Sequence, residues 1–242
     1  MCGIFSVISK YPTQKRELNA KVEIGLERIR HRGPDGRGVW VEPDHGIGFG
    51  HVRLSIIDLD TGAQPMELED GTVITFNGEI YNYLELREEL GAASFRTTSD
   101  TEVILRAYRR WGEDCVNRLR GMFAFLIWDP REQIVFFARD RFGVKPLYWY
   151  QDNQGTIYFS SEIKGLKPFV GESRVDHQAL SDYFSFQFCL GEKTLLAGVR
   201  EVLAAHCGRI ARDGTVCRPI GLVGCHTACR SSIRSVVVLR IL

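Results

Sequence analysis

The sequence predicts an α+β fold in which antiparallel sheets are layered with helices. Apolar segments of strand length follow one another along the chain as hairpin pairs, separated by short connections rich in Gly, Pro, Asp and Asn. Segments with helical periodicity stand between these pairs and not after every strand. Successive hairpins build antiparallel sheets, whereas a doubly wound parallel sheet needs a crossover helix after each strand. The order of the elements therefore favours antiparallel sheets with helices on their faces.

In the first part of the chain, one helix lies among three strands. Apolar residues recur at Leu18, Val22, Leu26 and Ile29, which predicts a helix from Lys15 to Ile29. Gly and Pro then mark a turn that ends this helix. The other predicted segments are a short buried strand over residues 2–8, the turn at 31–36, and strands at 38–41 and 46–57 joined by a hairpin-like connection at 43–46.

The rest of the chain alternates helices with strands. Residues 71–77 are predicted to be a strand that ends at Asn77-Gly78-Glu79, where Gly78 can adopt a backbone shape that other residues resist. Ser99, with Glu102 three residues later, matches a capping box and predicts the start of a helix. The remaining predicted elements are helices at 81–90, 97–111 and 176–188 and strand pairs at 122–129 with 133–140 and at 147–150 with 156–160.

The composition is that of an ordinary soluble globular protein. The 242 residues suffice for one or two domains, and they are 44% hydrophobic and 25% charged with a formal net charge of +1. So small a net charge gives no bulk attraction to nucleic acid or to an anionic membrane. The longest strongly apolar run, residues 122–128, is far shorter than the ~20 residues of a membrane helix. With no secretory leader and seven irregularly spaced cysteines, we expect a cytoplasmic protein.

The start of the chain, Met1-Cys2-Gly3, combines two groups that can work together. Removal of Met1 would leave a thiol and a free α-amine on the same residue. A thiol attacks carbonyl carbon as the thiolate, and an α-amine titrates near ~7.7–8.0, so it can serve as the base. Pairing a nucleophile with the terminal amine is a known activation scheme. Position alone does not decide the matter, because most cysteines at this position do nothing.

Six motifs stand in a fixed order along the chain. They are Cys2-Gly3-Ile4, HRGPDG at 31–36, RLSII at 53–57, FNGEIYNY at 76–83, SDTE at 99–102 and RDRFGVKPLY at 139–148. Together they resemble the glutaminase domain of class II glutamine amidotransferases, and most closely that of glutamine-hydrolysing asparagine synthetases. The resemblance covers residues 2 to about 216. It implies the N-terminal-nucleophile hydrolase fold, a four-layer αββα sandwich with two antiparallel sheets.

The same resemblance implies a site. Cys2 would attack the side-chain carbonyl of glutamine, while the Asn77 amide and the Gly78 N–H would stabilise the oxyanion. Substrate recognition would fall to Arg53 for the carboxylate, to Glu79 and Asp100 for the ammonium, and to backbone groups of Leu54, Ser55, Ile56 and Ile57. His31 and Arg32 are interpreted as scaffold. Without the motifs, Arg53 could be a surface cation, Asp100 a helix-start carboxylate and Asn77-Gly78 a plain turn.

The resemblance also implies a division of the chain. We predict a glutaminase domain over residues 2–190, the start of a connection to a synthetase domain over 191–216, and a divergent or out-of-frame, poorly ordered tail over 217–242. From Thr215 onward the chain has no acidic residue and no Phe, Trp or Tyr. No phosphate-loop motif occurs, and Gly46, Gly48 and Gly50 do not match a dinucleotide fingerprint. ATP and Mg²⁺ are therefore implied for the synthetase domain of the intact family protein, and no cofactor for this chain.

Several alternatives remain open at this point. The ammonia acceptor could be a carboxylate other than aspartate, or the chain could be a folded but inactive fragment. A homodimer is expected as in the family. A metal site built from cysteines and histidines has no support from spacing, because these residues match no common zinc pattern. The residues concerned are His206, Cys207, Cys217, Cys225, His226 and Cys229.

Overall fold

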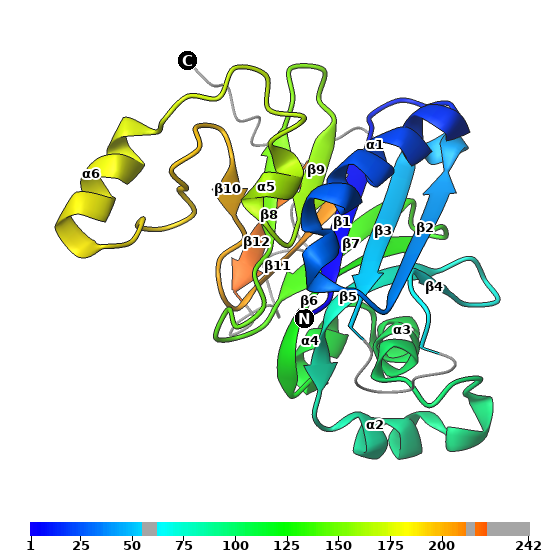
Figure 1. The fold of residues 1–242 in the computed structure, drawn as a ribbon. Helices are drawn as coiled ribbons and strands as arrows, with labels where there is room; N and C mark the ends of the chain where they lie inside the picture. Colours follow the sequence, from blue (N-terminus) through cyan, green and yellow to red (C-terminus); the bar gives the residue numbers. More distant parts are fainter. Residues whose placement is uncertain (55–61, 212–215, 222–242) are drawn as a thin grey trace.

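Two six-stranded sheets face each other, with helices on their outer faces (Figure 1). The computed structural model describes residues 1–54, 62–211 and 216–221. In spatial order the first sheet contains β10 (Arg200–Glu201), β8 (Tyr148–Gln151), β9 (Ile157–Ser160), β1 (Gly3–Ile8), β3 (Ile47–Arg53) and β2 (Gly36–Glu42). The second contains β12 (Val216–Gly221), β11 (His206–Ala211), β7 (Ile134–Arg139), β6 (Gly121–Asp129), β5 (Val73–Ile80) and β4 (Met66–Glu67).

All strand pairs within the two sheets are antiparallel, as predicted. Helix α1 (Lys15–Ile29) covers the first sheet, and α3 (Asp100–Trp111), with α2 (Tyr83–Leu90) and α4 (Cys115–Arg118), covers the second. The short α5 (Ile163–Leu166) lies beside α1, while α6 (His177–Phe186) stands away from the sheets (Figure 1). The layers are therefore helix, sheet, sheet, helix. None of the helices in the described residues is long and apolar enough to cross a membrane.

The strands are apolar on both faces because both faces are covered. In β1, Ile4 and Ile8 belong to the core between the sheets, whereas Phe5 and Val7 belong to the core beneath α1. Successive side chains of a strand point to opposite faces, so each strand contributes side chains to two cores. The core between the sheets also contains Ile47, Phe49, Val73, Ala124, Leu126, Trp128, Val135, Phe137, Leu147, Ile157, Phe159, Val202 and Ile210.

Helix α1 has the predicted bounds, and glycines let it lie close to the first sheet. A Cβ at Gly48 would stand 2.8 Å from Val22, and a Cβ at Gly50 would stand 2.5 Å from it. On the helix itself, a Cβ at Gly25 would stand 2.4 Å from the ring of Phe5. These glycines of β3 therefore serve helix packing.

The predicted end of the third strand is wrong. Strand β5 runs through to Ile80, and Gly78 pairs with Phe123 of β6 inside the ladder. Gly78 does not have a positive φ. A Cβ there would stand 2.2 Å from the carbonyl oxygen of Met122, so β6 approaches too closely for any side chain. Close approach, and not turn geometry, is the reason for glycine at this position.

The predicted capping box is formed only in part. Ser99 Oγ accepts a hydrogen bond of 3.1 Å from Thr101 N, as a helix cap should. Glu102 does not return a bond to Ser99 N, because its carboxylate accepts from the backbone N–H groups of Arg96 and Thr97 instead. Ser99 N donates to Thr97 Oγ1. The loop before α3 therefore takes the place of the second half of the box.

Strands continue beyond residue 190, where we placed the end of the glutaminase domain. Strand β10 pairs with β8 in the first sheet, and β11 pairs with β7 in the second. Strand β12 in turn pairs with β11. Most of the predicted tail, residues 222–242, lies outside the described residues, as do residues 55–57 of the predicted strand 46–57.

Gly25→Ala should destabilise the protein, although alanine normally stabilises a helix interior by about 1 kcal/mol relative to glycine. The new methyl group would meet the Phe5 ring at 2.4 Å, and overpacking a core typically costs about 1–3 kcal/mol. Urea unfolding measures the difference. Asn19→Ala, on the same helix and only partly buried, is the control and should not lower stability. A Gly25→Ala protein more stable than the wild type would contradict this packing.

Candidate active site

The site lies at one end of the space between the two sheets. Side chains alternate along a strand, so Cys2 lies on the same inner face of the first sheet as Ile4. Asn77 and Glu79 lie on the same inner face of the second sheet as Val73. These residues line a cleft that is open to solvent. All the predicted site residues that the structure describes line it, namely Cys2, Arg53, Leu54, Asn77, Gly78, Glu79 and Asp100. Ser55, Ile56 and Ile57 lie outside the described residues.

Cys2 is held at its sulfur and at its carbonyl. The Sγ atom donates to the carbonyl oxygen of Leu54 at 3.4 Å and accepts from Leu54 N at 3.3 Å. The buried Arg32 donates from Nε to the Cys2 carbonyl oxygen at 2.8 Å. The residue is thus anchored by two separate elements, and its sulfur faces the cleft.

A carboxylate behind Arg32 completes this anchor. Glu162 Oε1 accepts from Arg32 at 2.8 Å and contacts His31 Nε2 at 3.0 Å. Burial raises the pKa of Glu162, but hydrogen bonds from Arg32, Lys164 and His31 outweigh it and lower the pKa to about 2. His31 faces Glu162 and not Cys2, which agrees with the interpretation of His31 and Arg32 as scaffold. Sequence reasoning missed Glu162.

The charge on the Cys2 sulfur is set by opposing influences. Burial raises the pKa of the thiol above its ordinary value, because a thiolate loses solvation in the cleft. The hydrogen bond with Leu54 and the positive charges of the chain terminus, Arg53 and Lys145 act in the opposite direction. The thiol therefore depends on its neighbours to become a nucleophile.

Two hydrogen-bond donors lie in the cleft beside Cys2. The Asn77 side chain is 1% exposed, and its Nδ2 has no hydrogen-bond partner among the residues that the structure describes. The second donor is the backbone N–H of Gly78, and N–H groups two residues apart in a strand point to the same edge. Phe76 N donates to Gln64 Oε1 and Ile80 N donates to Asp100 Oδ2, so the Gly78 N–H points to this same edge, away from β6. The arrangement can receive a developing oxyanion.

Asp100 sits at the first turn of α3 and is 5% exposed. Its Oδ2 accepts from Ile80 N at 3.0 Å. Burial, assisted by the nearby negative charge of Glu79, raises the pKa of Asp100 from 3.8 to about 6, against the hydrogen bond from Ile80. A cation placed between Glu79 and Asp100 would relieve this repulsion.

Arg53, at the end of β3, is positioned by the HRGPDG turn. Asp35 N donates to the Arg53 carbonyl oxygen at 2.9 Å, and Pro34 forms a bridge with Arg53. A Cβ at Gly33 would stand 2.3 Å from Arg53 N, so the turn is packed against the backbone of this residue. The motif thus contributes to the site through Arg32 and through the placement of Arg53.

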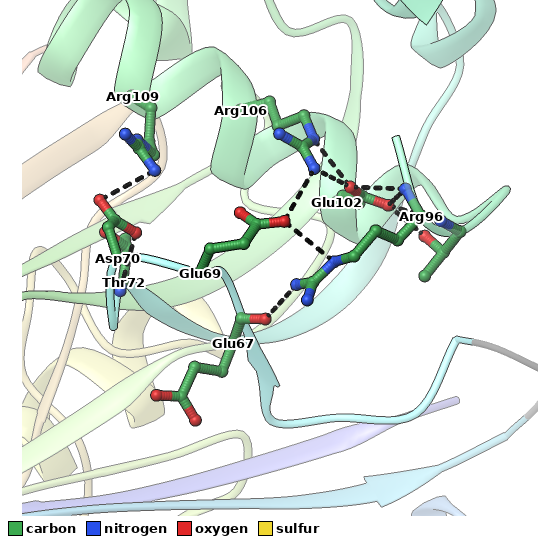
Figure 2. A network of polar contacts seen from close by, with 9 residues as sticks. Glu67, Glu69, Asp70, Thr72, Arg96, Glu102, Arg106 and Arg109 are labelled. Carbon is green, nitrogen blue, oxygen red and sulfur yellow. Dashed lines mark hydrogen bonds and ion pairs between the residues drawn. The ribbon is translucent and has the colours of Figure 1, made fainter. Parts of the chain in front are cut away.

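A polar network fixes the start of α3 and so the position of Asp100 (Figure 2). Glu102 is 1% exposed and binds Arg106 Nε at 2.7 Å in addition to the loop N–H groups. Arg96 Nη2 donates to the Glu67 carbonyl oxygen at 2.7 Å, and Arg96 Nε lies 3.2 Å from Glu69. The helix start is therefore tied to β4 and to the loop after it.

The two sheets are joined next to the site by polar contacts. His51 Nε2 lies 3.0 Å from the Phe76 carbonyl oxygen, and Thr75 Oγ1 donates to the Gly50 carbonyl oxygen at 3.1 Å. Since a carbonyl only accepts, His51 carries its proton on Nε2. Burial lowers the pKa of His51 to about 4, so the ring is neutral at physiological pH.

The cysteines outside the cleft do not form a site in the described residues. Cys115 is fully buried in the core, whereas Cys189 is only half-buried and donates to the Ala179 carbonyl oxygen. Within the described part of the chain no three His, Cys, Asp or Glu side chains gather as a metal site. The side chains of Cys217, Cys225, His226 and Cys229 are outside that part.

The fold is that of glutamine amidotransferases. The Bacillus subtilis glutamine phosphoribosylpyrophosphate amidotransferase structure aligns with a TM-score of 0.63 and 20% identity, over 90% of this chain and 49% of the other. A structure described as the allosteric regulatory enzyme of purine biosynthesis aligns with a TM-score of 0.65 and 19% identity, over 91% of this chain and 49% of the other. At these identities the likeness establishes the fold alone.

The chain belongs to the family of glutamine amidotransferase domains, whose pattern it matches over residues 1–220. Asparagine synthetase [glutamine-hydrolyzing] 1 of Bacillus subtilis is 45% identical over 89% of this chain and 34% of its own length. A putative asparagine synthetase of Methanocaldococcus jannaschii is 39% identical, over 78% of this chain and 40% of its own length. The chain thus spans between a third and two fifths of the length of these relatives and is homologous to their N-terminal glutaminase domains.

Asp100→Asn should stabilise the protein increasingly as the pH rises. The pKa of Asp100 is higher in the folded state than in the unfolded chain, so protonated Asp100 stabilises the fold. The wild type loses this contribution to its free energy of unfolding as the pH rises from about 4 to 6. The variant does not titrate and still offers an acceptor to Ile80. Its advantage should grow by roughly 1–3 kcal/mol between pH 4 and pH 8.

Chemical unfolding at the two pH values measures this growth. Asp44→Asn, at an exposed position outside the cleft, makes the same change in net charge and serves as control. A stability difference for Asp100→Asn that stays constant from pH 4 to pH 8 would show that Asp100 ionises as freely in the fold as in the unfolded chain.

Proposed function

We propose that Cys2 hydrolyses glutamine to glutamate and ammonia through a thioester. The observation that carries the proposal is the buried Asn77 Nδ2, which lies in the cleft that holds the Cys2 sulfur and lacks a partner within the described part of the chain. A buried donor without an acceptor costs free energy unless a ligand supplies the acceptor. A tetrahedral oxyanion formed on the glutamine carbonyl supplies one to Asn77 Nδ2 and another to the Gly78 N–H.

The proton balance assigns a role to the chain terminus. After removal of Met1, the α-amine of Cys2 takes the thiol proton as the bond from Sγ to the amide carbon forms. The same proton passes to the leaving nitrogen as the carbon–nitrogen bond breaks and ammonia departs. Water then adds to the thioester carbon, the carbon–sulfur bond breaks, and glutamate leaves with the thiol restored.

Recognition of the amino-acid end of glutamine follows from the charges in the cleft. Arg53 binds the α-carboxylate, with help from the backbone of residues 54–57. Glu79 and Asp100 bind the α-ammonium. The ammonium separates the two carboxylates and favours the ionised form of Asp100, so substrate binding relieves a repulsion that the free site contains.

The ammonia acceptor is proposed from the relatives named above. If a synthetase domain follows as it does in the family, the ammonia would serve the ATP- and Mg²⁺-dependent conversion of aspartate to asparagine, in a cytoplasmic homodimer. Another carboxylate acceptor, or a folded fragment without activity, are the rival proposals. No metal or nucleotide takes part in the steps assigned to this chain.

Cys2→Ala should lower glutamate release from glutamine by roughly 10⁴-fold or more, as loss of a nucleophile typically does. Stability should change little, because the side chain is only half-buried and its contacts with Leu54 are weak. An enzymatic assay of glutamate measures the rate, and mass spectrometry of the terminus shows whether Met1 is absent.

Cys189→Ala is the matched control, because this thiol is also half-buried but lies outside the cleft. It should keep full activity. Glutamate release by Cys2→Ala at the wild-type rate would overturn the proposed mechanism, and an inactive wild type that lacks Met1 would favour the inactive-fragment alternative.

Arg53→Ala should raise KM for glutamine by roughly 10- to 100-fold, since charge-assisted hydrogen bonds contribute about 1.5–3 kcal/mol. Asp100→Asn should raise KM in the same direction at pH 8, while kcat changes less, because neither residue touches the reacting amide. Steady-state kinetics separate the two parameters. Arg37→Ala, at a cation that pairs with Glu23 outside the cleft, should leave KM unchanged. An unchanged KM in both cleft variants would refute the assigned orientation of the substrate.

A further inference from the structure

Lys145 lines the same cleft as Cys2, and most of the residue is buried. Only 7% of the residue is exposed. Among the described residues, no hydrogen bond or ion pair reaches its Nζ. A lysine with so little exposed surface usually pairs its ammonium with an anion. Sequence reasoning quoted this residue within a motif but gave it no role.

The backbone of Lys145 is fixed without any help from its side chain. Its N–H donates to Asp140 Oδ2 at 3.0 Å, and its carbonyl oxygen accepts from Arg139 Nε at 2.8 Å. Asp140 also accepts from the N–H groups of Phe142 and Val144, and Arg139 Nη2 binds the Gly143 carbonyl oxygen. The RDRFGVKPLY segment is thus a loop scaffold. Its hydrogen bonds hold the Lys145 backbone while the ammonium stays unpaired.

The charged groups around Lys145 indicate which anion its ammonium acts on. Burial lowers the pKa of Lys145, and the Cys2 thiolate is the foremost influence that favours its charged form, with Arg32 opposing and Glu79 and Asp140 assisting. From the side of the sulfur, the charged groups are the chain terminus, Arg53 and Lys145. Arg53 is needed for a substrate carboxylate under the proposed function, and the terminal amine must be neutral to act as base. Lys145 is the cation that remains for the sulfur itself.

We infer that the Lys145 ammonium stabilises the Cys2 sulfur as a thiolate and thereby sets its reactivity toward an electrophilic carbon. This deepens the proposed function by adding an electrostatic residue to it. The effect acts on the free site, before any substrate binds. It can therefore be measured with a simple alkylating reagent, independently of glutamine hydrolysis.

The test is the pH dependence of Cys2 alkylation by iodoacetamide, followed by mass spectrometry of the peptide that contains Cys2. The whole chain is used, and peptide analysis separates Cys2 from the other cysteines. In Lys145→Met the midpoint should move upward by about one pH unit, the typical effect of one nearby charge. A rise of one unit lowers the thiolate fraction at pH 7 by about tenfold, and the higher nucleophilicity of a more basic thiolate offsets part of this loss. Alkylation at pH 7 should therefore slow by roughly three- to tenfold.

Three further variants make the result specific. Lys145→Arg keeps the charge and should keep most of the wild-type midpoint. Lys10→Met removes an exposed charge just beyond the end of β1 that is remote from Cys2. At about 3.3 Å per strand residue, Lys10 lies about 25 Å from Cys2, so this variant should not move the midpoint. Lys145→Gln replaces Lys145→Met should the latter not fold. Lys145→Met should also unfold at no lower a temperature than the wild type, because methionine keeps the apolar part of the largely buried side chain and the ammonium that it replaces has no ion pair among the described residues.

An unchanged midpoint in a folded Lys145→Met or Lys145→Gln protein would overturn the inference. An equal shift in Lys10→Met would overturn it as well, because the effect would then belong to net charge. A shift confined to the neutral Lys145 variants supports it. The midpoint could differ between the wild type and the neutral Lys145 variants while the wild type releases no glutamate. That result would refute the proposed function and leave the inference standing.

Discussion

The hydrogen bond from Arg32 to the carbonyl oxygen of Cys2 is the contact on which the site depends. The first residues of a chain are usually poorly ordered unless something ties them down. Here Arg32 fixes the carbonyl, Leu54 fixes the sulfur, and Gly3 enters the pairing of β1 with β3. None of these contacts uses the α-amine that Cys2 would expose. The contacts of the Cys2 carbonyl and sulfur and the pairing of Gly3 thus order the terminus without using the amine, which leaves the amine available for proton transfer.

Two acidic residues on one helix show how the cleft differs from the scaffold around it. Glu102 and Asp100 are both almost fully buried near the start of α3. Burial raises the pKa of Glu102, but several donors from Arg96, Thr97 and Arg106 outweigh it and lower the pKa below its ordinary value. Asp100 faces Glu79 with fewer donors, and its pKa rises to about 6. The charge of Glu102 is stabilised by donors of the fold itself, whereas the charge of Asp100 would be stabilised by a bound cation.

The same contrast applies to the neutral and basic groups of the cleft. Among the described residues, the buried Asn77 Nδ2 has no hydrogen-bond partner, and no hydrogen bond or ion pair reaches the ammonium of the largely buried Lys145. Unpaired polar groups reduce stability, and in a cleft a ligand or a reacting atom can supply the missing partner. Their gathering in one cleft with Cys2 is therefore stronger support for a reactive site than any one of them alone.

Local sequence patterns predicted the elements whose bounds depend on neighbouring residues in the chain. The stripe of Leu18, Val22, Leu26 and Ile29 gave both bounds of α1, because its apolar face repeats at the helical period. Asn77-Gly78 was interpreted as the end of a strand, because this dipeptide favours turns. Pairing with β6 overrides that preference and carries β5 on to Ile80. Tertiary contact of this kind is invisible in a local pattern.

The candidate site was predictable to the extent that motifs marked it. Cys2, Arg53, Asn77 and Asp100 come from four separate motifs, and the structure brings them into one cleft. The sequence could not single out Lys145, because a lysine within a motif looks the same whether its ammonium is paired or not. Glu162 was missed for a similar reason, since its importance comes from its contact with Arg32, which is 130 residues distant in the chain.

Directional contacts between the sheets determine how the two halves of the site meet. Cys2 and Arg53 belong to the first sheet, whereas Asn77 and Glu79 belong to the second. Apolar packing alone is non-directional and would allow the sheets to slide against each other. His51 and Thr75 bond across the interface to backbone carbonyls, two residues from Arg53 and from Asn77 respectively. Since the pKa of His51 is lowered to about 4, its neutral ring keeps this contact through the pH range in which the Cys2 thiol would react. Hydrogen bonds, more than the apolar core, thus fix the position of Cys2 relative to Asn77.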